Sequence, residues 1–374
     1  MACGPRMTFA RATGILRAMP RPIRAAIDTA ALAHNLALAR RQAGSAKIWA
    51  VLKANAYGHG LLRSARALDG ADGFAVLDLV EALRLREAGI AKPILMLEGF
   101  FKPADIELLA RHRLTPVIHN VEQIEMLEKT RLEGALAVYL KVNSGMNRLG
   151  FTVDNVRLAW NALEAHAGVE SITLMTHFAD ADGEGGVAAQ LQWFRELVQP
   201  FDAPCSLANS AALLRYAEET RADWVRPGIM LYGCSPFAFK SAAEIGLKPA
   251  MTLTSEIIAV QHLQPGEWIG YGQTYQTTQE MTVGIVACGY ADGYPRHAPS
   301  GTPVLVAGQR TCTVGRVSMD MICVDISDLP EAYVGTPATL WGDGLPCDEV
   351  ATSAGTVSYE LLCAVAPRVP VIEV

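Results

Sequence analysis

The sequence predicts an α/β protein in which a (β/α)8 TIM barrel is followed by a mostly β C-terminal domain. From about residue 23 to residue 232, short apolar runs alternate with amphipathic stretches, the pattern of repeated βα units. Beyond about residue 243, runs of valine, isoleucine and threonine are separated by glycine and proline turns. The length of 374 residues and the 51% hydrophobic composition allow two domains with buried cores.

The barrel strands are expected where apolar and β-branched residues form short runs. A first strand near residues 23–27 precedes the barrel. The eight barrel strands are expected near residues 48–52, 74–77, 94–97, 115–118, 136–142, 172–176, 205–208 and 224–225. Three intervening helices carry start signals: Thr29 as the N-cap of one, Pro103 in the first turn of another and Asp154 as the N-cap of a third.

The second domain is expected to be a β-sandwich or barrel. Its strands are predicted near residues 252–260, 282–287, 303–306 and 321–326. The predicted domain limits are a leader over residues 1–19, the barrel over 20–242 and the β-domain over 243–374. The leader carries arginines without a following apolar segment, which indicates a flexible extension rather than an export signal.

Charge and cysteine usage exclude several classes of partner. The net charge of −6 provides no basic face for nucleic acid, and no apolar run is long enough to span a membrane. The eight cysteines are dispersed, without a CxxC pair or a histidine cluster at metal-ligand spacing. We therefore expect a cytoplasmic protein with reduced cysteines, no metal, no nucleic-acid partner and no membrane partner.

Polar residues recur where the predicted barrel strands end. Lys53 follows the first barrel strand, at the end of a strand where a desolvated amine becomes a nucleophile. The others are Lys141, His177, Asn209, Ser210 and Arg226. Taken singly, each of these residues could have a purely structural role, such as a solvated surface lysine or a salt-bridged arginine. Together they lie at the face where barrels of this kind carry active sites.

These residue types suit pyridoxal phosphate. The cofactor forms a Schiff base with a lysine, acts as an electron sink and needs a partner at its pyridine nitrogen. Ser210 and the backbone over residues 227–229 offer hydroxyl and N–H donors for its phosphate. Lys53 is the candidate for the covalent attachment.

Several segments together resemble the alanine racemase family, a group of fold-type III pyridoxal phosphate enzymes. The matching segments are residues 50–60 (AVLKANAYGHG), 141–150 (KVNSGMNRLG), 176–178 (THF), 209–210 (NS), 225–229 (VRPGI), 270–272 (GYG), 289–293 (GYADG) and 318–320 (SMD). The resemblance runs from about residue 20 to residue 374 and is strongest to the bacterial catabolic type. Asn143 stands where many members have aspartate, and Ser318 where some have cysteine.

The resemblance implies roles for individual residues. It implies that Lys53 and Tyr271 exchange the α-proton of alanine on opposite faces, with Tyr271 supplied across a homodimer interface. Arg148 and Met319 would contact the substrate, and Lys141 matches a position that is carbamylated in many members. The implied cofactor contacts are Tyr57, His177, Asn209, Ser210, Arg226, Gly228, Ile229 and Tyr359. Taken without the resemblance, Tyr271 also fits a packing role in the β-domain.

Arg226 helps to distinguish a racemase from two alternative functions, a decarboxylase and a non-catalytic cofactor carrier. A guanidinium at the pyridine nitrogen donates a hydrogen bond but no proton, which weakens the electron sink and favours racemisation. A basic amino-acid decarboxylase shares the expected architecture but benefits from a carboxylate at this position. A non-catalytic cofactor carrier would not need Tyr271 and Met319. The expected function is interconversion of L-alanine and D-alanine, with serine as a slower substrate.

Overall fold

The structure is a computed structural model that describes residues 21–374. The predicted leader, 1–19, lies outside the described residues. The chain divides into two compact units. The barrel unit comprises Ile27–Thr252, Pro346–Val365 and Glu373–Val374, and the β unit comprises Leu253–Leu345, Ala366–Ile372 and the described residues before Ile27. The expected boundary between the barrel and the β-domain, between residues 242 and 243, stays a prediction.

Eight parallel strands close the barrel in chain order, as the sequence predicts. They are β2 (Lys47–Val51), β3 (Gly73–Val76), β4 (Ile94–Met96), β5 (Leu114–Ile118), β6 (Leu136–Lys141), β7 (Val169–Met175), β8 (Cys205–Ser206) and β9 (Trp224–Val225). The pair Ile48↔Val225 joins the first strand to the last. Every residue of β3 and β4 is buried, which explains why these strands read as continuous apolar runs.

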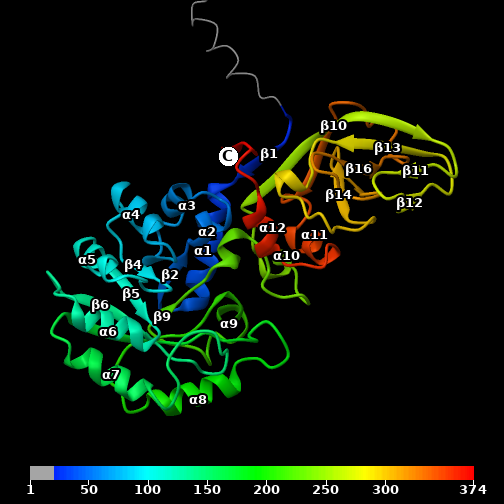
Figure 1. The fold of residues 1–374 in the computed structure, drawn as a ribbon. Coiled ribbons are helices and arrows are strands. Elements are labelled where there is room, and N and C mark those ends of the chain that lie inside the picture. Colours follow the sequence, from blue (N-terminus) through cyan, green and yellow to red (C-terminus); the bar gives the residue numbers. More distant parts are fainter. Residues whose placement is uncertain (1–20) are drawn as a thin grey trace, which may run out of the picture. The chain divides into compact units, whose positions relative to one another are not determined.

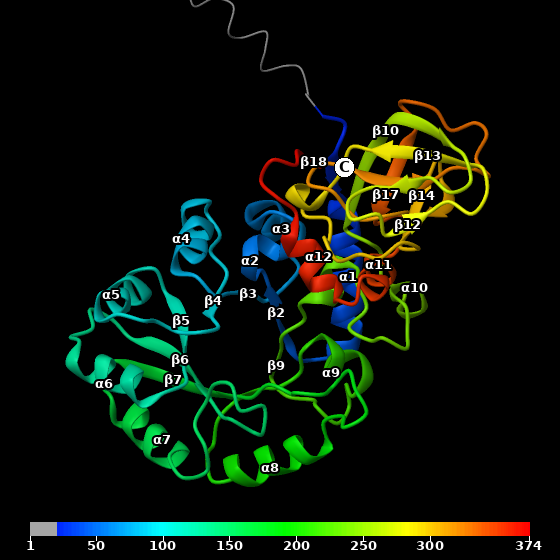
Figure 2. The same ribbon diagram turned by 45° about the vertical axis from the view of Figure 1, so that its right-hand side comes forward.

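Helices surround the barrel strands on the outside, as Figure 2 shows for α4 to α8. The helices of the barrel unit are α1 (Thr29–Ala43), α2 (Lys53–Tyr57), α3 (Leu61–Ala67), α4 (Leu79–Glu87), α5 (Pro103–Arg111), α6 (Val121–Lys129), α7 (Val156–Ala165), α8 (Ala188–Val198), α9 (Ser210–Arg215), η3 (Ile229–Tyr232), α10 (Ala242–Ile245), α11 (Cys347–Ser353) and α12 (Ser358–Ala364). Pro103 opens α5 as expected.

Two of the predicted helix caps are wrong. Asp28, not Thr29, caps α1, because its extended backbone lets Oδ1 accept a hydrogen bond from the Ala31 N–H at 2.9 Å. At α7 the N-cap is Asn155, not Asp154, and no side chain caps the helix. The Asn155 Oδ1 instead accepts from the Thr152 N–H at 2.7 Å, so it stabilises the preceding turn.

The β unit is built on an eight-stranded sheet in which the long strand β10 (Met251–Leu263) is central (Figure 1). The first half of β10 pairs with β17 (Pro337–Trp341) and its second half pairs with β13 (Met281–Val286), with a register shift between Ile257 and Ala259. The remaining strands of the sheet are β1 (Arg24–Ile27), β14 (Pro303–Val306), β15 (Gln309–Cys312), β16 (Ile322–Asp325) and β18 (Val371–Glu373). A separate hairpin pairs β11 (Trp268–Ile269) with β12 (Tyr275–Gln276).

Candidate active site

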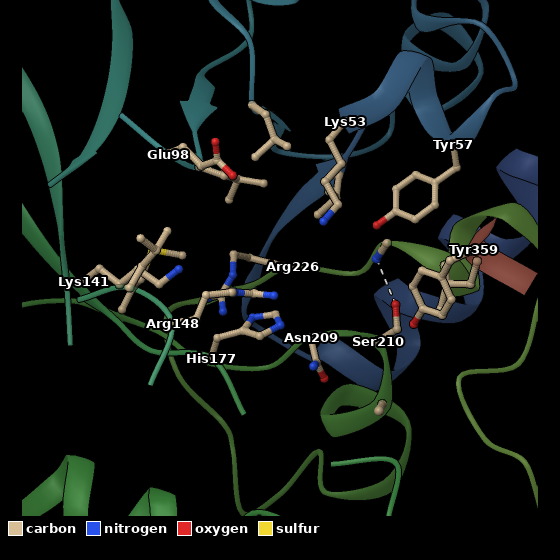
Figure 3. Close-up of a pocket in the computed structure, with 18 of the residues that line it drawn as sticks. Lys53, Tyr57, Glu98, Lys141, Arg148, His177, Asn209, Ser210, Arg226 and Tyr359 are labelled. Atoms are coloured by element: carbon tan, nitrogen blue, oxygen red, sulfur yellow. Dashed lines mark hydrogen bonds between the residues drawn. The ribbon is translucent and has the colours of Figure 1, made fainter. Parts of the chain in front are cut away.

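A cavity of about 500 Å³ opens within the barrel unit, at the carboxyl ends of the barrel strands. The structure brings eleven of the residues expected in the site into its lining, as the labels in Figure 3 help to follow. They are Lys53, Tyr57, Lys141, Arg148, His177, Asn209, Ser210, Arg226, Gly228, Ile229 and Tyr359. The full lining collects residues from the ends of all eight barrel strands and from α12, which lies more than 300 residues after β2 in the chain.

Lys53 leaves the end of β2 and is followed by a turn of left-handed backbone. Ala54, Asn55, Ala56 and Tyr57 have φ angles of 54°, 53°, 55° and 51°. This conformation costs L-residues roughly 1–2 kcal/mol each, and it is rarely adopted by consecutive residues. Gly58 follows at φ 80°, and a Cβ there would lie 2.2 Å from the Leu362 carbonyl oxygen. The close approach of α12 therefore requires glycine at this position.

Two lysine amines share the cavity with arginine side chains. Burial, followed by the charge of Arg148, lowers the pKa of Lys53. Burial, followed by the charges of Arg226 and Arg148, lowers the pKa of Lys141 to about 8. Both amines are therefore more readily deprotonated than a solvated lysine. Glu98 opposes this effect at both lysines through its negative charge.

Arg226 is held inside the barrel by neutral acceptors. Its guanidinium donates to Ser206 Oγ at 2.6 Å, to the Thr176 carbonyl at 2.6 Å and to the Leu207 carbonyl at 3.0 Å. Burial lowers the pKa of Arg226 to about 10, which leaves it charged at neutral pH. Its hydrogen-bond partners within residues 21–374 include no carboxylate, so it is not the salt-bridged arginine that the strand-end position also allowed.

Hydroxyl groups gather at one end of the cavity. Ser210 Oγ accepts hydrogen bonds from the backbone N–H groups of Gly228 at 2.8 Å and Met230 at 3.4 Å. A Cβ at Gly228 would lie 2.5 Å from Tyr57 Oη, so only glycine leaves room for this hydroxyl. Burial raises the pKa of Tyr57 and of Tyr359, so both phenols stay protonated and can donate hydrogen bonds. Figure 3 shows the three hydroxyl-bearing side chains at the same end of the pocket.

In Figure 3 His177 and Asn209 are neighbours, with His177 on the side of Arg148 and Asn209 on the side of Ser210. Burial, and then the charge of Arg226, holds the pKa of His177 well below its usual range, so its ring is neutral at pH 7. Asn209 is the N-cap of α9, where its Oδ1 accepts from the Ala212 N–H at 2.9 Å. This hydrogen bond gives Asn209 a structural task and leaves its amide NH₂ available to the cavity.

Tyr271 and Met319 belong to the β unit and are not part of the cavity lining. Tyr271 lies in the loop between β11 and β12, and 70% of it is exposed, which contradicts the alternative of a packed tyrosine. Gly270 and Gly272 flank it with φ angles of 72° and 74°. Met319 is 52% exposed, and its carbonyl accepts a hydrogen bond from the Ala291 N–H at 2.9 Å.

Several lining residues were missed from the sequence. Glu98 follows β4 and His119 follows β5, so the strand-end rule that selected Lys53 would have found both. The ring of His119 contacts the Glu98 carbonyl at 3.1 Å, and burial lowers the pKa of His119. Asp182 comes from the long segment between β7 and α8, where no pattern marks it.

Within residues 21–374, none of the helices has the length and apolar character needed to cross a bilayer. The same residues contain no group of three or more histidine, cysteine or acidic side chains arranged to hold a metal ion. Neither finding assigns a chemistry to the cavity. The chemistry rests on the lysines, arginines and hydroxyl groups described above.

Comparison with known proteins identifies the family. Models of the alanine racemase N-terminal and C-terminal domains match residues 27–236 and 250–373. The chain is 56% identical to the alanine racemase of Paraburkholderia phytofirmans, over 94% of this chain and 99% of the relative. It is 54% identical to the catabolic alanine racemase of Klebsiella aerogenes, over 95% of this chain and 99% of the relative.

A solved structure agrees with this relationship. The biosynthetic alanine racemase of Pseudomonas aeruginosa matches with a TM-score of 0.92 and 48% identity, over 95% of this chain and 99% of that chain. Both family models and near full-length relatives thus agree with the barrel and the β-rich unit. The chain therefore belongs to the alanine racemase family and is an amino-acid racemase, an isomerase.

Proposed function

We propose that this racemase interconverts L-alanine and D-alanine with pyridoxal phosphate, using Lys53 on one face of the α-carbon and Tyr271 of the partner subunit on the other. The observation that carries the proposal is the cavity itself. It combines an amine of lowered pKa with a charged arginine held by three neutral acceptors and with a group of hydroxyls. The family relationship supplies the substrate.

The cavity fits the proposed cofactor. Tyr57, Ser210 and Tyr359 offer hydroxyl groups at one end, suited to a phosphate, and Gly228 leaves the space that Tyr57 Oη needs. When bound, the cofactor would stabilise the negative charge that develops on the substrate α-carbon. Lys53 would hold it covalently, and Ile229, His177 and Asn209 would complete its surroundings.

Lys53 then has two tasks. It would hold the cofactor through its Nζ, and it would accept or return the α-proton on its own face of the substrate. The lowered pKa supports both tasks, because a neutral amine is needed for attachment and for proton acceptance. Glu98, whose charge opposes this lowering, would limit how far the pKa falls.

Arg226 favours racemisation over the decarboxylase alternative. It stays charged at neutral pH and is fixed by three neutral acceptors, so it can donate a hydrogen bond to the pyridine nitrogen but has no proton to give up. A decarboxylase benefits from a carboxylate in this position, which would keep that nitrogen protonated. The carrier alternative leaves the exposed Tyr271 unexplained.

Arg148 is proposed to bind the substrate carboxylate, with its orientation set by a carbamate on Lys141. A carbamate forms when the neutral Lys141 amine attacks carbon dioxide, making an N–C bond and releasing a proton. With a pKa of about 8, a substantial fraction of Lys141 is neutral at physiological pH. The added negative charge would offset the surrounding lysines and arginines and pair with Arg148.

The second base is proposed to come from another copy of the chain. Tyr271 and Met319 are exposed, as residues that complete another subunit's site would be in a single chain. A homodimer would then hold two composite sites. We propose a cytoplasmic role in supplying D-alanine for peptidoglycan, in returning it to L-alanine for breakdown, or in both, with serine as a slower substrate.

Incubation with each alanine enantiomer in heavy water tests the proposal. Both enantiomers should lose optical rotation and gain deuterium at the α-carbon, and both changes should require added pyridoxal phosphate after the protein has been stripped of it. Deuterium incorporation without racemisation would support proton exchange on one face only. Release of carbon dioxide from a basic amino acid would instead support the decarboxylase alternative.

A further inference from the structure

The left-handed turn after Lys53 is fixed partly by hydrogen bonds of its own. The Ala56 N–H donates to the Leu52 carbonyl at 2.8 Å and the Gly58 N–H donates to the Ala54 carbonyl at 3.1 Å. Asn55 links the turn to the start of α3, because its side-chain Oδ1 accepts a hydrogen bond from the Leu61 N–H at 2.9 Å. Asparagine tolerates this backbone region, whereas alanine does not favour it, so these local contacts leave the two alanines strained.

A carboxylate from a different helix completes the turn. Glu81 lies in the first turn of α4, and its Oε1 accepts the hydrogen bond of the Asn55 N–H at 2.8 Å. The backbone N–H of Leu77, a cavity-lining residue just after β3, acts on the same carboxylate in the direction that lowers its pKa. Glu81 thus ties together the chain segments that follow β2 and β3.

Charge makes this contact stronger than an ordinary hydrogen bond. A carboxylate that accepts from backbone N–H groups forms shorter and stronger bonds than a neutral acceptor. Asp78 already caps α4 by accepting from the Val80 N–H at 2.6 Å, so Glu81 is not needed for that cap. Its carboxylate instead accepts a hydrogen bond from the turn that carries Lys53 and Tyr57.

We propose that Glu81 is a positioning residue for the racemase reaction: it holds the left-handed turn through the Asn55 N–H and thereby fixes the directions of Lys53 and Tyr57. The proposal rests on the proposed function for the roles of these two side chains. Glu81 itself does not line the cavity. Its effect on the reaction would therefore pass through the backbone rather than through contact with substrate.

Three variants of the cofactor-loaded protein test this role. Glu81→Leu removes the acceptor, Glu81→Asp keeps the charge but shortens the side chain by one methylene, and Glu81→Gln keeps a neutral acceptor at the same length. Glu122→Leu is the matched control, because Glu122 is an exposed acidic residue in the first turn of α6. Each variant is compared by hydrogen exchange of residues 50–61 and by separate measurement of kcat and KM.

Glu81→Leu and Glu81→Asp should each speed amide exchange in residues 50–61 and lower kcat about 10- to 100-fold, since small misplacement of a reacting group has this cost. KM should change less than about threefold, because Arg148 is untouched, and Glu81→Gln should recover only part of kcat, because its amide oxygen can still accept from the Asn55 N–H but carries no charge. If Glu81→Leu does not fold, Glu81→Asp carries the test.

Unchanged exchange in residues 50–61 together with unchanged kcat in Glu81→Asp would overturn the proposal. An equal effect of Glu122→Leu would also overturn it, because the loss would then reflect general destabilisation. Hydrogen exchange does not depend on turnover, so it reports on the turn even if the unsubstituted protein fails the heavy-water test of the proposed function.

Discussion

The cavity of the barrel unit and the Tyr271 loop of the β unit hold their functional groups in opposite ways. In the cavity, Arg226 is buried and fixed by three hydrogen bonds, and Ser210 is fixed by the Gly228 N–H. In the loop, Tyr271 is largely exposed and lies between two glycines of positive φ. The cavity residues are therefore held by contacts within their own chain, whereas the β-unit loop exposes Tyr271 to solvent or to another molecule.

This difference teaches how the two proposed bases are tuned. Lys53 has its pKa lowered by burial and by Arg148, so its reactivity is set by the barrel unit itself. Tyr271 is largely exposed in its own loop, so the groups that assist it as a base must come from what it contacts when a site is complete. We expect substitutions in the two regions to differ in size, in direction dependence and in response to subunit mixing.

The largest effect is expected for Lys53→Ala. Loss of both the cofactor attachment and one acid/base group should lower the racemisation rate by about 10⁴-fold or more in both directions. Lys47→Ala is the control, because Lys47 is an exposed lysine at the opposite end of β2. Comparable rates for Lys53→Ala and Lys47→Ala, measured by polarimetry from each enantiomer, would break the assignment of Lys53.

Tyr271→Phe should have the next largest effect. Removing one general acid/base group lowers rates by about 10²- to 10⁴-fold. Proton removal should fail mainly for one enantiomer, because the two bases face opposite sides of the α-carbon. Folding should be unaffected, since the hydroxyl of an exposed tyrosine is removed. Solvent deuterium incorporation from each enantiomer measures the asymmetry, and equal small losses would contradict a two-base mechanism.

Mixing the two inactive variants shows which chain supplies Tyr271. If it acts across subunits, a heterodimer of Lys53→Ala and Tyr271→Phe chains contains one intact site. Random exchange of subunits in a C2 dimer should then restore about one quarter of the original activity. If Tyr271 acts in its own chain, no site in the mixture is intact and activity should not return.

Much of the barrel unit could be predicted because its signals are local. Each barrel strand is an apolar run, and the polar residues that end those runs meet at one face of the cavity. The same rule would have added Glu98 and His119. The helix caps were harder, because Asp28 and Thr29 are both acceptable cap residues and only the extended backbone of Asp28 decides between them.

The turn after Lys53 could not be predicted in the same way. Alanine favours right-handed helix, so Ala54 and Ala56 argue against the backbone that they adopt. The turn depends on contacts from distant parts of the chain, namely the Glu81 carboxylate and the Leu362 carbonyl beside Gly58. Likewise, β1 and β18 join one sheet from opposite ends of the described chain, which no local pattern indicates.

The smallest expected effect is a pH dependence of stability that arises from Lys141 in the cavity. Lys141 has a pKa of about 8 in the folded chain against an unperturbed value of 10.5. Above pH 8 the unfolded chain therefore binds more protons at this residue, so its contribution to the free energy of unfolding rises with pH up to about pH 10.5. This rise should amount to about 1–3 kcal/mol in buffer free of carbon dioxide.

Lys141→Met should remove that rise, so its stability advantage over the unsubstituted protein should shrink as the pH increases. Urea titrations at several pH values measure the difference, in which the contribution of Lys53 cancels because both proteins contain it. Lys129→Met, at an exposed lysine of α6, should leave the pH dependence unchanged. Bicarbonate should stabilise only proteins that retain Lys141, since carbamate formation requires its amine. Parallel curves for Lys141→Met and Lys129→Met would show that the cavity does not lower the proton affinity of Lys141.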